Sequence, residues 1–315
     1  MSRVLVTTDY LHPGDEVDAL LRKHGHQVSY RPAEGGRGTG DALALFDGIA
    51  GAVVASEPIT AEMITRATDL RVIARSGVGY DSIDVAAAAA RGIRVCNTPG
   101  VNHDAVAELT IALMLMAARR LTSVIDGVRE GRWPRDAGHE LRGATLGVLG
   151  YGPSGRALAR LGAAFGMTVL VDTSHPDASA AGVQFVDRDT VIAAADYLSL
   201  HSRASASTGR MIDRDVLSAM KDTAVLINTA RGALVDEDAL ADALETGQIA
   251  GAALDVVDVE PLPADSRLRG LDNVVITSHL AGQTVEARAR AGLAAAHAVI
   301  DVLDGRDPEH PVDHG

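Results

Sequence analysis

The feature that most constrains this chain is the hexapeptide Gly150-Tyr151-Gly152-Pro153-Ser154-Gly155. An apolar run over residues 145–149 precedes it and an Ala- and Leu-rich stretch over 156–165 follows, a pattern of strand, glycine loop and helix. Glycines in this context let backbone N–H groups and a helix N-terminus approach a pyrophosphate. A further apolar run ends at Asp172, about 20 residues on, where an acid binds the adenosine ribose. We therefore predict a dinucleotide-binding unit rather than a simple tight turn.

Short β-branched runs alternate with Ala/Leu-rich stretches along almost the whole chain, which is typical of parallel βαβ units. In the first third we predict a glycine-rich loop over 35–40 and strands over residues 3–7, 26–30, 51–54, 71–74 and 93–96. A single core stops growing at about 250–300 residues. The 315 residues therefore predict two doubly wound α/β domains.

A long apolar helix is predicted over residues 104–121, with Asn102 or Asp104 as its N-terminal cap. The polar stretch 131–143, which carries the only Trp, is predicted to be a loop. A second series of strands and helices is expected from 145 to 277. An Ala-rich helix over 285–303 is expected near the end of the sequence.

Composition excludes several classes of function. Lys and Arg number 29 against 42 Asp and Glu, a net charge of −13, which argues against binding nucleic acid or an anionic membrane surface. The single Cys96 cannot form an internal disulfide and suits a reducing cytosol. The N-terminus becomes charged too early for a signal peptide, and no apolar run is long enough to span a membrane. We expect a cytoplasmic protein without a metal site.

Three polar residues, Arg231, Glu260 and His279, follow apolar strands of the second series. Ligands of open α/β sheets bind beyond the carboxyl ends of the strands, so we expect these side chains in one cleft. A guanidinium can bind a carboxylate bidentately and polarise a carbonyl, and a histidine can supply a proton near neutral pH. A carboxylate beside the histidine would orient the ring and favour its charged form. Each residue alone is compatible with an ordinary structural role on the surface, in a turn or in the core. The three together predict hydride transfer to a 2-oxo acid.

These motifs resemble those of the D-isomer-specific 2-hydroxyacid dehydrogenase family, and the resemblance covers essentially the whole chain. The matching stretches are residues 75–81 (RSGVGYD), 97–100 (NTPG), 106–108 (VAE), 146–155 (LGVLGYGPSG), 226–232 (LINTARG), 252–256 (AALDV), 260–262 (EPL) and 279–282 (HLAG).

The resemblance implies a Rossmann NAD-binding domain over residues 99–284 and a flavodoxin-like, discontinuous substrate domain from 1–98 and 285–315. It assigns substrate orientation to Arg231, acid/base chemistry to His279 and the carboxylate partner to Glu260. It also implies a homodimer through the 104–121 helix and the Trp133 loop.

The same resemblance implies two sets of binding residues. The substrate carboxylate would meet backbone N–H groups of Ser76, Gly77, Val78 and Gly79. The cofactor would contact Gly150, Gly152, Pro153, Ser154, Gly155, Asp172, Thr173, His201, Ser202, Arg203, Thr208, Thr229, Ala230, Asp255, His279 and Gly282.

The sequence departs from the family pattern at three places. Pro153-Ser154 replaces a basic or polar residue followed by an aliphatic one, and proline removes one possible donor to the pyrophosphate. Asp172 stands where the family has an aromatic residue and Thr173 where it has the acid, which leaves two candidates for the ribose. Arg203 replaces a proline, and it can meet the pyrophosphate, a second acidic group on the substrate, or only solvent.

We predict NAD(H) rather than NADP(H), because Asp172 would repel a 2′-phosphate and residues 173–177 offer no arginine, although His175 could carry charge. Residues 53–58 are apolar and then acidic at Glu57, which disfavours a phosphorylated substrate. The sequence stops at Gly315, so no regulatory domain is expected. We predict a small substrate such as glyoxylate or hydroxypyruvate. One alternative is a D-3-phosphoglycerate dehydrogenase that lacks a regulatory domain, or a similar enzyme for a phosphonate analogue. Another, from a different class, is an NAD(H)-sensing, corepressor-like binding protein.

Overall fold

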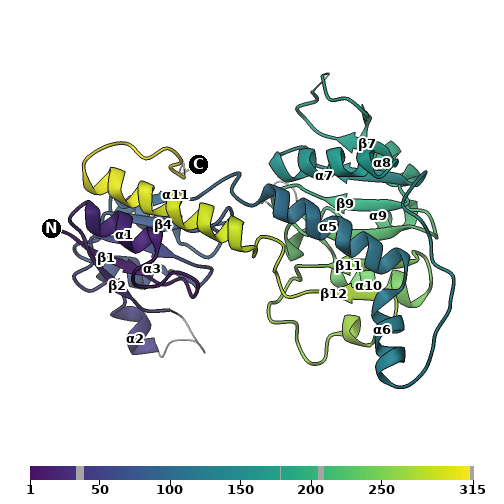
Figure 1. The fold of residues 1–315 in the computed structure, drawn as a ribbon, viewed down its shortest axis with the longest axis horizontal. Coiled ribbons are helices and arrows are strands. Elements are labelled where there is room, and N and C mark those ends of the chain that lie inside the picture. Colours follow the sequence, from purple (N-terminus) through teal and green to yellow (C-terminus); the bar gives the residue numbers. More distant parts are fainter. Residues whose placement is uncertain (33–38, 178, 205–208, 313–315) are drawn as a thin grey trace. The chain divides into compact units, whose positions relative to one another are not determined.

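The computed structural model describes residues 1–32, 39–177, 179–204 and 209–312. The chain divides into two compact units (Figure 1): unit 1 is Met1–Asn102 with Gln283–Gly315, and unit 2 is His103–Gly282. The sequence placed these boundaries at 98/99 and 284/285. Both units are α/β folds around a parallel sheet, which confirms the predicted fold class.

Unit 1 contains a five-stranded sheet in the order β2-β1-β3-β4-β5, which is the flavodoxin-like order. Its strands are β1 (Arg3–Val6), β2 (Gln27–Tyr30), β3 (Gly51–Val54), β4 (Val72–Arg75) and β5 (Arg94–Cys96). Its helices are α1 (Glu16–Lys23), α2 (Thr39–Leu43), α3 (Ala61–Arg66), α4 (Val85–Ala90) and α11 (Val285–Leu303).

Both faces of this sheet are covered, because successive residues of a strand point to opposite sides. Val4 and Val6 pack with α1 and α11, whereas Leu5 packs with residues of α3 and α4 on the other face. Figure 1 shows α11 running beside α1, so the last helix of the chain completes a core that the first hundred residues begin.

Unit 2 contains a seven-stranded parallel sheet in the order β12-β11-β10-β9-β6-β7-β8. Its strands are β6 (Thr145–Leu149), β7 (Thr168–Asp172), β8 (Val183–Phe185), β9 (Tyr197–Leu200), β10 (Val225–Asn228), β11 (Gly251–Leu254) and β12 (Val274–Ile276). The order reverses between β6 and β9, and a doubly wound sheet binds its ligand in the crevice at such a switch point.

The helices of unit 2 are α5 (His103–Ala118), α6 (Leu121–Arg129), α7 (Pro153–Ala164), α8 (Arg188–Ala194), α9 (Arg214–Ala219) and α10 (Glu237–Glu245), with short 3-10 turns η1 (Gly232–Leu234) and η2 (Arg267–Gly270). Residues of α5 and α7 pack on one face of the sheet, and residues of α8, α9 and α10 on the other. Among the described helices, none combines the length and apolar character needed to cross a membrane.

Three details of the sequence prediction are wrong. The long helix over 104–121 ends at Ala118, because Arg120 adopts a left-handed φ of 50°, and α6 then begins at Leu121. Neither a glycine nor a proline marks this break in the sequence. Asp104 lies inside α5 and is not its cap. The glycine-rich loop was predicted to reach residue 40, but α2 begins at Thr39; residues 33–38 lie outside the description.

Candidate active site

The glycine loop joins β6 to α7 in unit 2, and its geometry depends on the absence of side chains. Gly150 has a φ of 105°, and a Cβ on Gly155 would lie 2.2 Å from the Gly150 carbonyl oxygen. A Cβ on Gly152 would meet nothing within 4 Å, so the outer side of the loop is open. Gly152 caps α7 and Pro153 is its first residue. This open helix N-terminus fits the pyrophosphate of a dinucleotide.

His201 follows β9 and lies behind the glycine loop. Its Nδ1 is 3.0 Å from Ser154 Oγ, and its Nε2 is 3.0 Å from Ser199 Oγ. Burial lowers the pKa of His201 to about 4, so its ring is neutral near pH 7. The predicted cofactor residues Ser154 and His201 therefore lie in direct contact.

The other predicted cofactor residues fall into several environments. Thr173 Oγ1 accepts a hydrogen bond from the His175 amide at 3.2 Å. Ser202 Oγ donates to the Leu149 carbonyl. Thr229 is buried, with its hydroxyl 3.1 Å from that of Thr110 on α5. Of the remaining predicted cofactor residues, Ala230 and Gly282 are partly buried and Arg203 is exposed. Thr208 lies outside the described residues.

Asp255 follows β11 and is only 1% exposed. Its carboxylate accepts hydrogen bonds from Thr277 Oγ1 at 2.6 Å and from the amides of Leu280 and Ala281 at 3.0 and 2.8 Å. Its own carbonyl accepts from the His279 amide at 2.8 Å. Asp255 thus holds the loop around His279, a positioning role that the sequence analysis did not assign.

His279 and Glu260 form a charge-assisted pair. His279 Nδ1 lies 2.8 Å from Glu260 Oε2, and the other oxygen of Glu260 accepts the Val257 amide at 3.3 Å. The His279 backbone has a left-handed φ of 56°. The two side chains are 48% and 39% exposed, and within the described residues His279 Nε2 has no partner. The ring is therefore oriented through Nδ1, while Nε2 is not used in a contact with the described residues.

Arg231 lies in the loop after β10, and Asn228 fixes the shape of that loop. Asn228 Nδ2 donates to the Arg231 carbonyl at 2.9 Å, and its Oδ1 accepts from the Ala230 amide at 3.0 Å. A Cβ on Gly232 would lie 2.0 Å from the Val257 carbonyl carbon, so only glycine allows this approach. The loop of Arg231 thus packs against the segment that carries Glu260.

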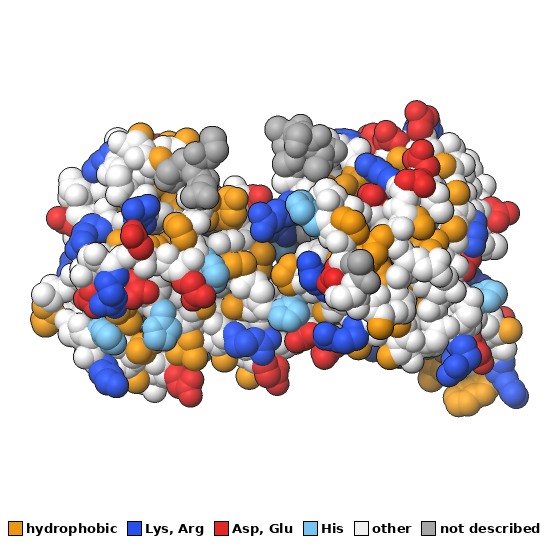
Figure 2. Space-filling model, turned by 90° about the horizontal axis from the view of Figure 1, so that it is seen from above, with side chains coloured by type: hydrophobic (Ala, Val, Ile, Leu, Met, Phe, Trp, Pro, Cys, Tyr) orange, Lys and Arg blue, Asp and Glu red, His pale blue; other side chains and the backbone are white. Residues whose placement is uncertain are grey.

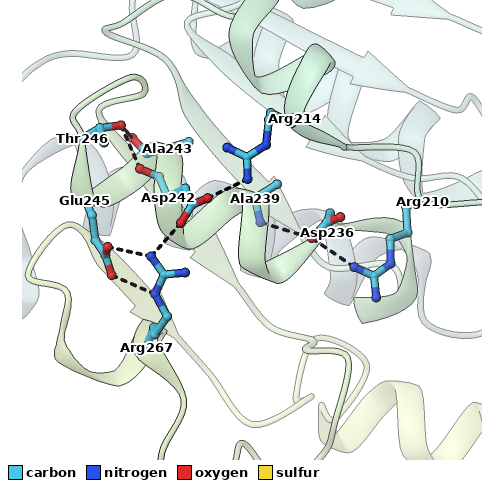
Figure 3. Close-up of polar contacts among 9 residues, drawn as sticks. All are labelled: Arg210, Arg214, Asp236, Ala239, Asp242, Ala243, Glu245, Thr246 and Arg267. Carbon is cyan, nitrogen blue, oxygen red and sulfur yellow. Dashed lines mark hydrogen bonds and ion pairs between the residues drawn. The ribbon is translucent and has the colours of Figure 1, made fainter.

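The segment after Glu260 is fixed to α10 by a network of charges (Figure 3). Arg267 donates from Nε and Nη2 to the two carboxylate oxygens of Glu245, at 3.1 and 2.6 Å, and from Nη2 to Asp242 at 2.8 Å. Arg214 donates to the other oxygen of Asp242 at 2.6 Å. These guanidinium groups hold the pKa values of Asp242 and Glu245 below their usual range. We call Arg267, Glu245, Asp242 and Arg214 the α10 network.

The loop 76–79 belongs to unit 1, at the end of β4. The Ser76 amide donates to the Val54 carbonyl at 3.0 Å, and the Gly77 amide donates to the Arg75 carbonyl at 2.9 Å. Among the described residues, nothing accepts a hydrogen bond from the amides of Val78 and Gly79. Of the four residues predicted to bind the substrate carboxylate through backbone N–H groups, Val78 and Gly79 are therefore the two whose amides are available.

Four residues that support these sites were not predicted. Tyr10 donates to Ser76 Oγ at 2.7 Å, and Arg288 of α11 lies over the Tyr10 ring, 4.8 Å from its centre. Asn228 and Ser199 could have been suspected, because each is a polar residue within or just after an apolar run. Tyr10 gave no such sign.

Comparison with known proteins identifies a family model, a relative and a solved structure that match this chain. The family model for the NAD-binding domain of D-isomer-specific 2-hydroxyacid dehydrogenases matches residues 111–281. A hydroxypyruvate reductase of Thermotoga maritima is 41% identical over 241 residues, which cover 75% of this chain and 78% of that one. A crystal structure of a protein from Thermus thermophilus superposes with a TM-score of 0.91 at 38% identity, covering 99% of this chain and 100% of the other.

One relative of this chain is a longer protein that is named for a phosphorylated substrate. A D-3-phosphoglycerate dehydrogenase of Archaeoglobus fulgidus is 42% identical over 252 residues, which cover 78% of this chain. The match covers 48% of that protein, so this chain spans about half its length.

Proposed function

The chain belongs to the D-isomer-specific 2-hydroxyacid dehydrogenase family of NAD-dependent oxidoreductases, and on that premise we propose that it interconverts a small 2-hydroxy acid and its 2-oxo acid. The observation that carries the proposal is the His279–Glu260 pair, in which Nδ1 is held at 2.8 Å and the side chain of His279 is 48% exposed. A ring held in this way can give a proton to a forming alkoxide and take one back in the reverse direction.

Each residue of the site has a distinct role in this proposal. Bound NADH supplies the hydride. His279 donates a proton from Nε2 to the oxygen that becomes the hydroxyl, and Glu260 offsets the positive charge of the ring. Arg231 binds the substrate carboxylate and polarises the carbonyl.

NADH oxidation, measured against a panel of 2-oxo acids, tests the proposal. We expect turnover of glyoxylate, hydroxypyruvate or another short 2-oxo acid, and loss of turnover in His279→Ala. If the wild-type protein binds NADH tightly but reduces none of them, the alternative of an NAD(H)-sensing binding protein takes its place.

For the cofactor we propose NAD(H) rather than NADP(H). The Asp172 carboxylate ends β7, where it would bind the ribose hydroxyls and repel a 2′-phosphate, and residues 173–177 contain no arginine. Comparison of kcat/KM for NADH and NADPH tests this, and a preference for NADPH would contradict it.

For the substrate we propose an unphosphorylated acid. Both carboxylate oxygens of Glu57 are buried just after β3, where a phosphate would meet repulsion. Arg203 is the residue that supports the alternative of 3-phosphohydroxypyruvate or a phosphonate. Kinetics with 3-phosphohydroxypyruvate and hydroxypyruvate, repeated in Arg203→Pro, separate the two. A large preference for the phosphorylated acid that disappears in the variant would favour the alternative.

We also propose that the protein is a cytoplasmic homodimer. The apolar side chains of Ile125, Val128 and Trp133 are 45%, 46% and 79% exposed on α6 and the loop after it, whereas acidic and basic side chains are interspersed on the face in Figure 2. A second copy of the chain would cover these apolar groups. Light scattering after size exclusion should give a dimer mass that Ile125→Asp reduces to a monomer mass. A wild-type monomer would contradict the proposal.

A further inference from the structure

Three polar side chains form a row at the glycine loop of unit 2. Ser199 Oγ, on β9, lies 3.0 Å from His201 Nε2. His201 Nδ1 lies 3.0 Å from Ser154 Oγ, in the first turn of α7. Because β9 and β6 are neighbours and α7 follows β6, the row spans the switch point of the sheet. The row includes Ser154, which has a hydroxyl at a position where the family pattern has an aliphatic side chain.

The burial of Ser199 sets the direction of these hydrogen bonds. Ser199 is 0% exposed, and within the described residues His201 Nε2 is the acceptor available to its hydroxyl proton. A buried hydroxyl proton without an acceptor is costly, so Ser199 donates to Nε2. A neutral imidazole has one donor and one acceptor nitrogen. The ring proton of His201 is therefore on Nδ1.

This tautomer determines how the Ser154 hydroxyl is used. His201 Nδ1–H donates to Ser154 Oγ, so the hydroxyl proton of Ser154 is free to point away from the ring. Ser154 is partly buried at the N-terminus of α7, where the partial positive charge of the helix favours anions. Its neighbour Pro153 has no N–H to offer.

We propose that the Ser154 hydroxyl donates a hydrogen bond to the pyrophosphate of NAD, in place of the backbone donor that Pro153 lacks. His201 and Ser199 are then positioning residues, since they set the direction of that hydroxyl without touching the cofactor. This inference rests on the NAD-dependent function proposed above.

Titration of the protein with NADH, followed by nucleotide fluorescence, measures the contribution of Ser154. Ser154→Ala should weaken NADH binding about tenfold or more, the effect of one hydrogen bond to a charged group. Ser218→Ala removes an exposed hydroxyl that bonds to the Asp215 carbonyl on α9, and it should leave the Kd unchanged. Wild-type affinity in Ser154→Ala would overturn the proposal. Absence of NADH binding in the wild-type protein would instead overturn the NAD-dependent function itself.

A double-mutant cycle tests the positioning role. His201→Leu should weaken NADH binding when Ser154 is present and have little further effect in Ser154→Ala, whereas equal losses in both backgrounds would contradict the relay. His201→Asn should restore part of the affinity, because its amide N–H replaces the donor at Nδ1. In the folded wild-type protein, ¹⁵N NMR of the histidine ring should show the Nδ1–H tautomer, and the Nε2–H tautomer would overturn the assignment.

Discussion

The His279–Glu260 pair and the α10 network both involve residues of the segment after β11, and their exposure to solvent is similar. His279 and Glu260 are 48% and 39% exposed, while Arg267 and Glu245 are each 42% exposed. Both clusters contain a cation and a carboxylate at hydrogen-bond distance. Burial alone therefore does not separate a reactive pair from a structural one.

The two clusters differ in whether their nitrogen-containing side chain can exchange a proton. Arg267 is always charged and uses two nitrogens to bind two carboxylates, so its arrangement favours rigidity. His279 uses a single ring nitrogen on Glu260, which leaves its second nitrogen for proton transfer. We infer that the α10 network fixes the segment after Glu260 while the His279–Glu260 pair performs proton transfer.

The largest effect is expected from His279→Ala. Loss of a positioned proton donor should lower kcat by about 10²–10⁴-fold. Steady-state kinetics with the preferred 2-oxo acid measure this, with circular dichroism as a check on folding. Wild-type kcat would remove His279 from the mechanism.

Arg231→Lys keeps a positive charge but removes the planar pair of donors. We expect the KM for the 2-oxo acid to rise about 10- to 100-fold, as for loss of a hydrogen bond between charged groups, while NADH affinity stays nearly unchanged. Parallel measurement of KM and of the NADH Kd separates the two. A variant that loses NADH affinity but keeps its KM would contradict the assignment of Arg231 to the substrate.

Glu260→Gln leaves an acceptor for His279 Nδ1 but removes its negative charge. We expect a loss of about tenfold in kcat/KM, because a charge-assisted hydrogen bond is roughly twice as strong as a neutral one. Steady-state kinetics with the preferred 2-oxo acid measure this loss. A variant with the kcat/KM of the wild type would assign Glu260 a purely structural role.

The smallest effect on catalysis is expected from Arg267→Ala, which should lower Tm while leaving kcat near that of the wild type. The pKa values of Asp242 and Glu245 are lowered in the folded protein, so their contribution to stability is present above the unfolded pKa values and is lost as pH falls through the folded ones. The Tm difference between variant and wild type should therefore be present at pH 7 and vanish in acid. A large loss of kcat would instead link the α10 network to proton transfer.

Much of the fold could be predicted from the sequence, because its strands are short apolar runs bounded by clear breaks. The strand over 145–149 and the helix over 285–303 have the observed ends. The break at Arg120 could not be predicted, because its left-handed conformation occurs at a residue that is neither glycine nor asparagine.

For the candidate site, the sequence could nominate Arg231, Glu260 and His279 because each follows an apolar strand, and the structure brings Glu260 and His279 together. It could not show that Asp255 binds the loop of His279, or that Ser199 orients His201. Those contacts join residues distant in sequence or set the direction of a proton, and neither has a local pattern.

A single-turnover experiment on His279→Ala tests the central claim most directly. The variant is loaded with NADH, mixed with the preferred 2-oxo acid, and followed through one round of NADH oxidation, with the NADH Kd measured on the same sample. We expect an unchanged Kd and a rate of NADH oxidation at least about 100-fold below that of the wild type. A wild-type rate in that single turnover would contradict proton transfer by His279.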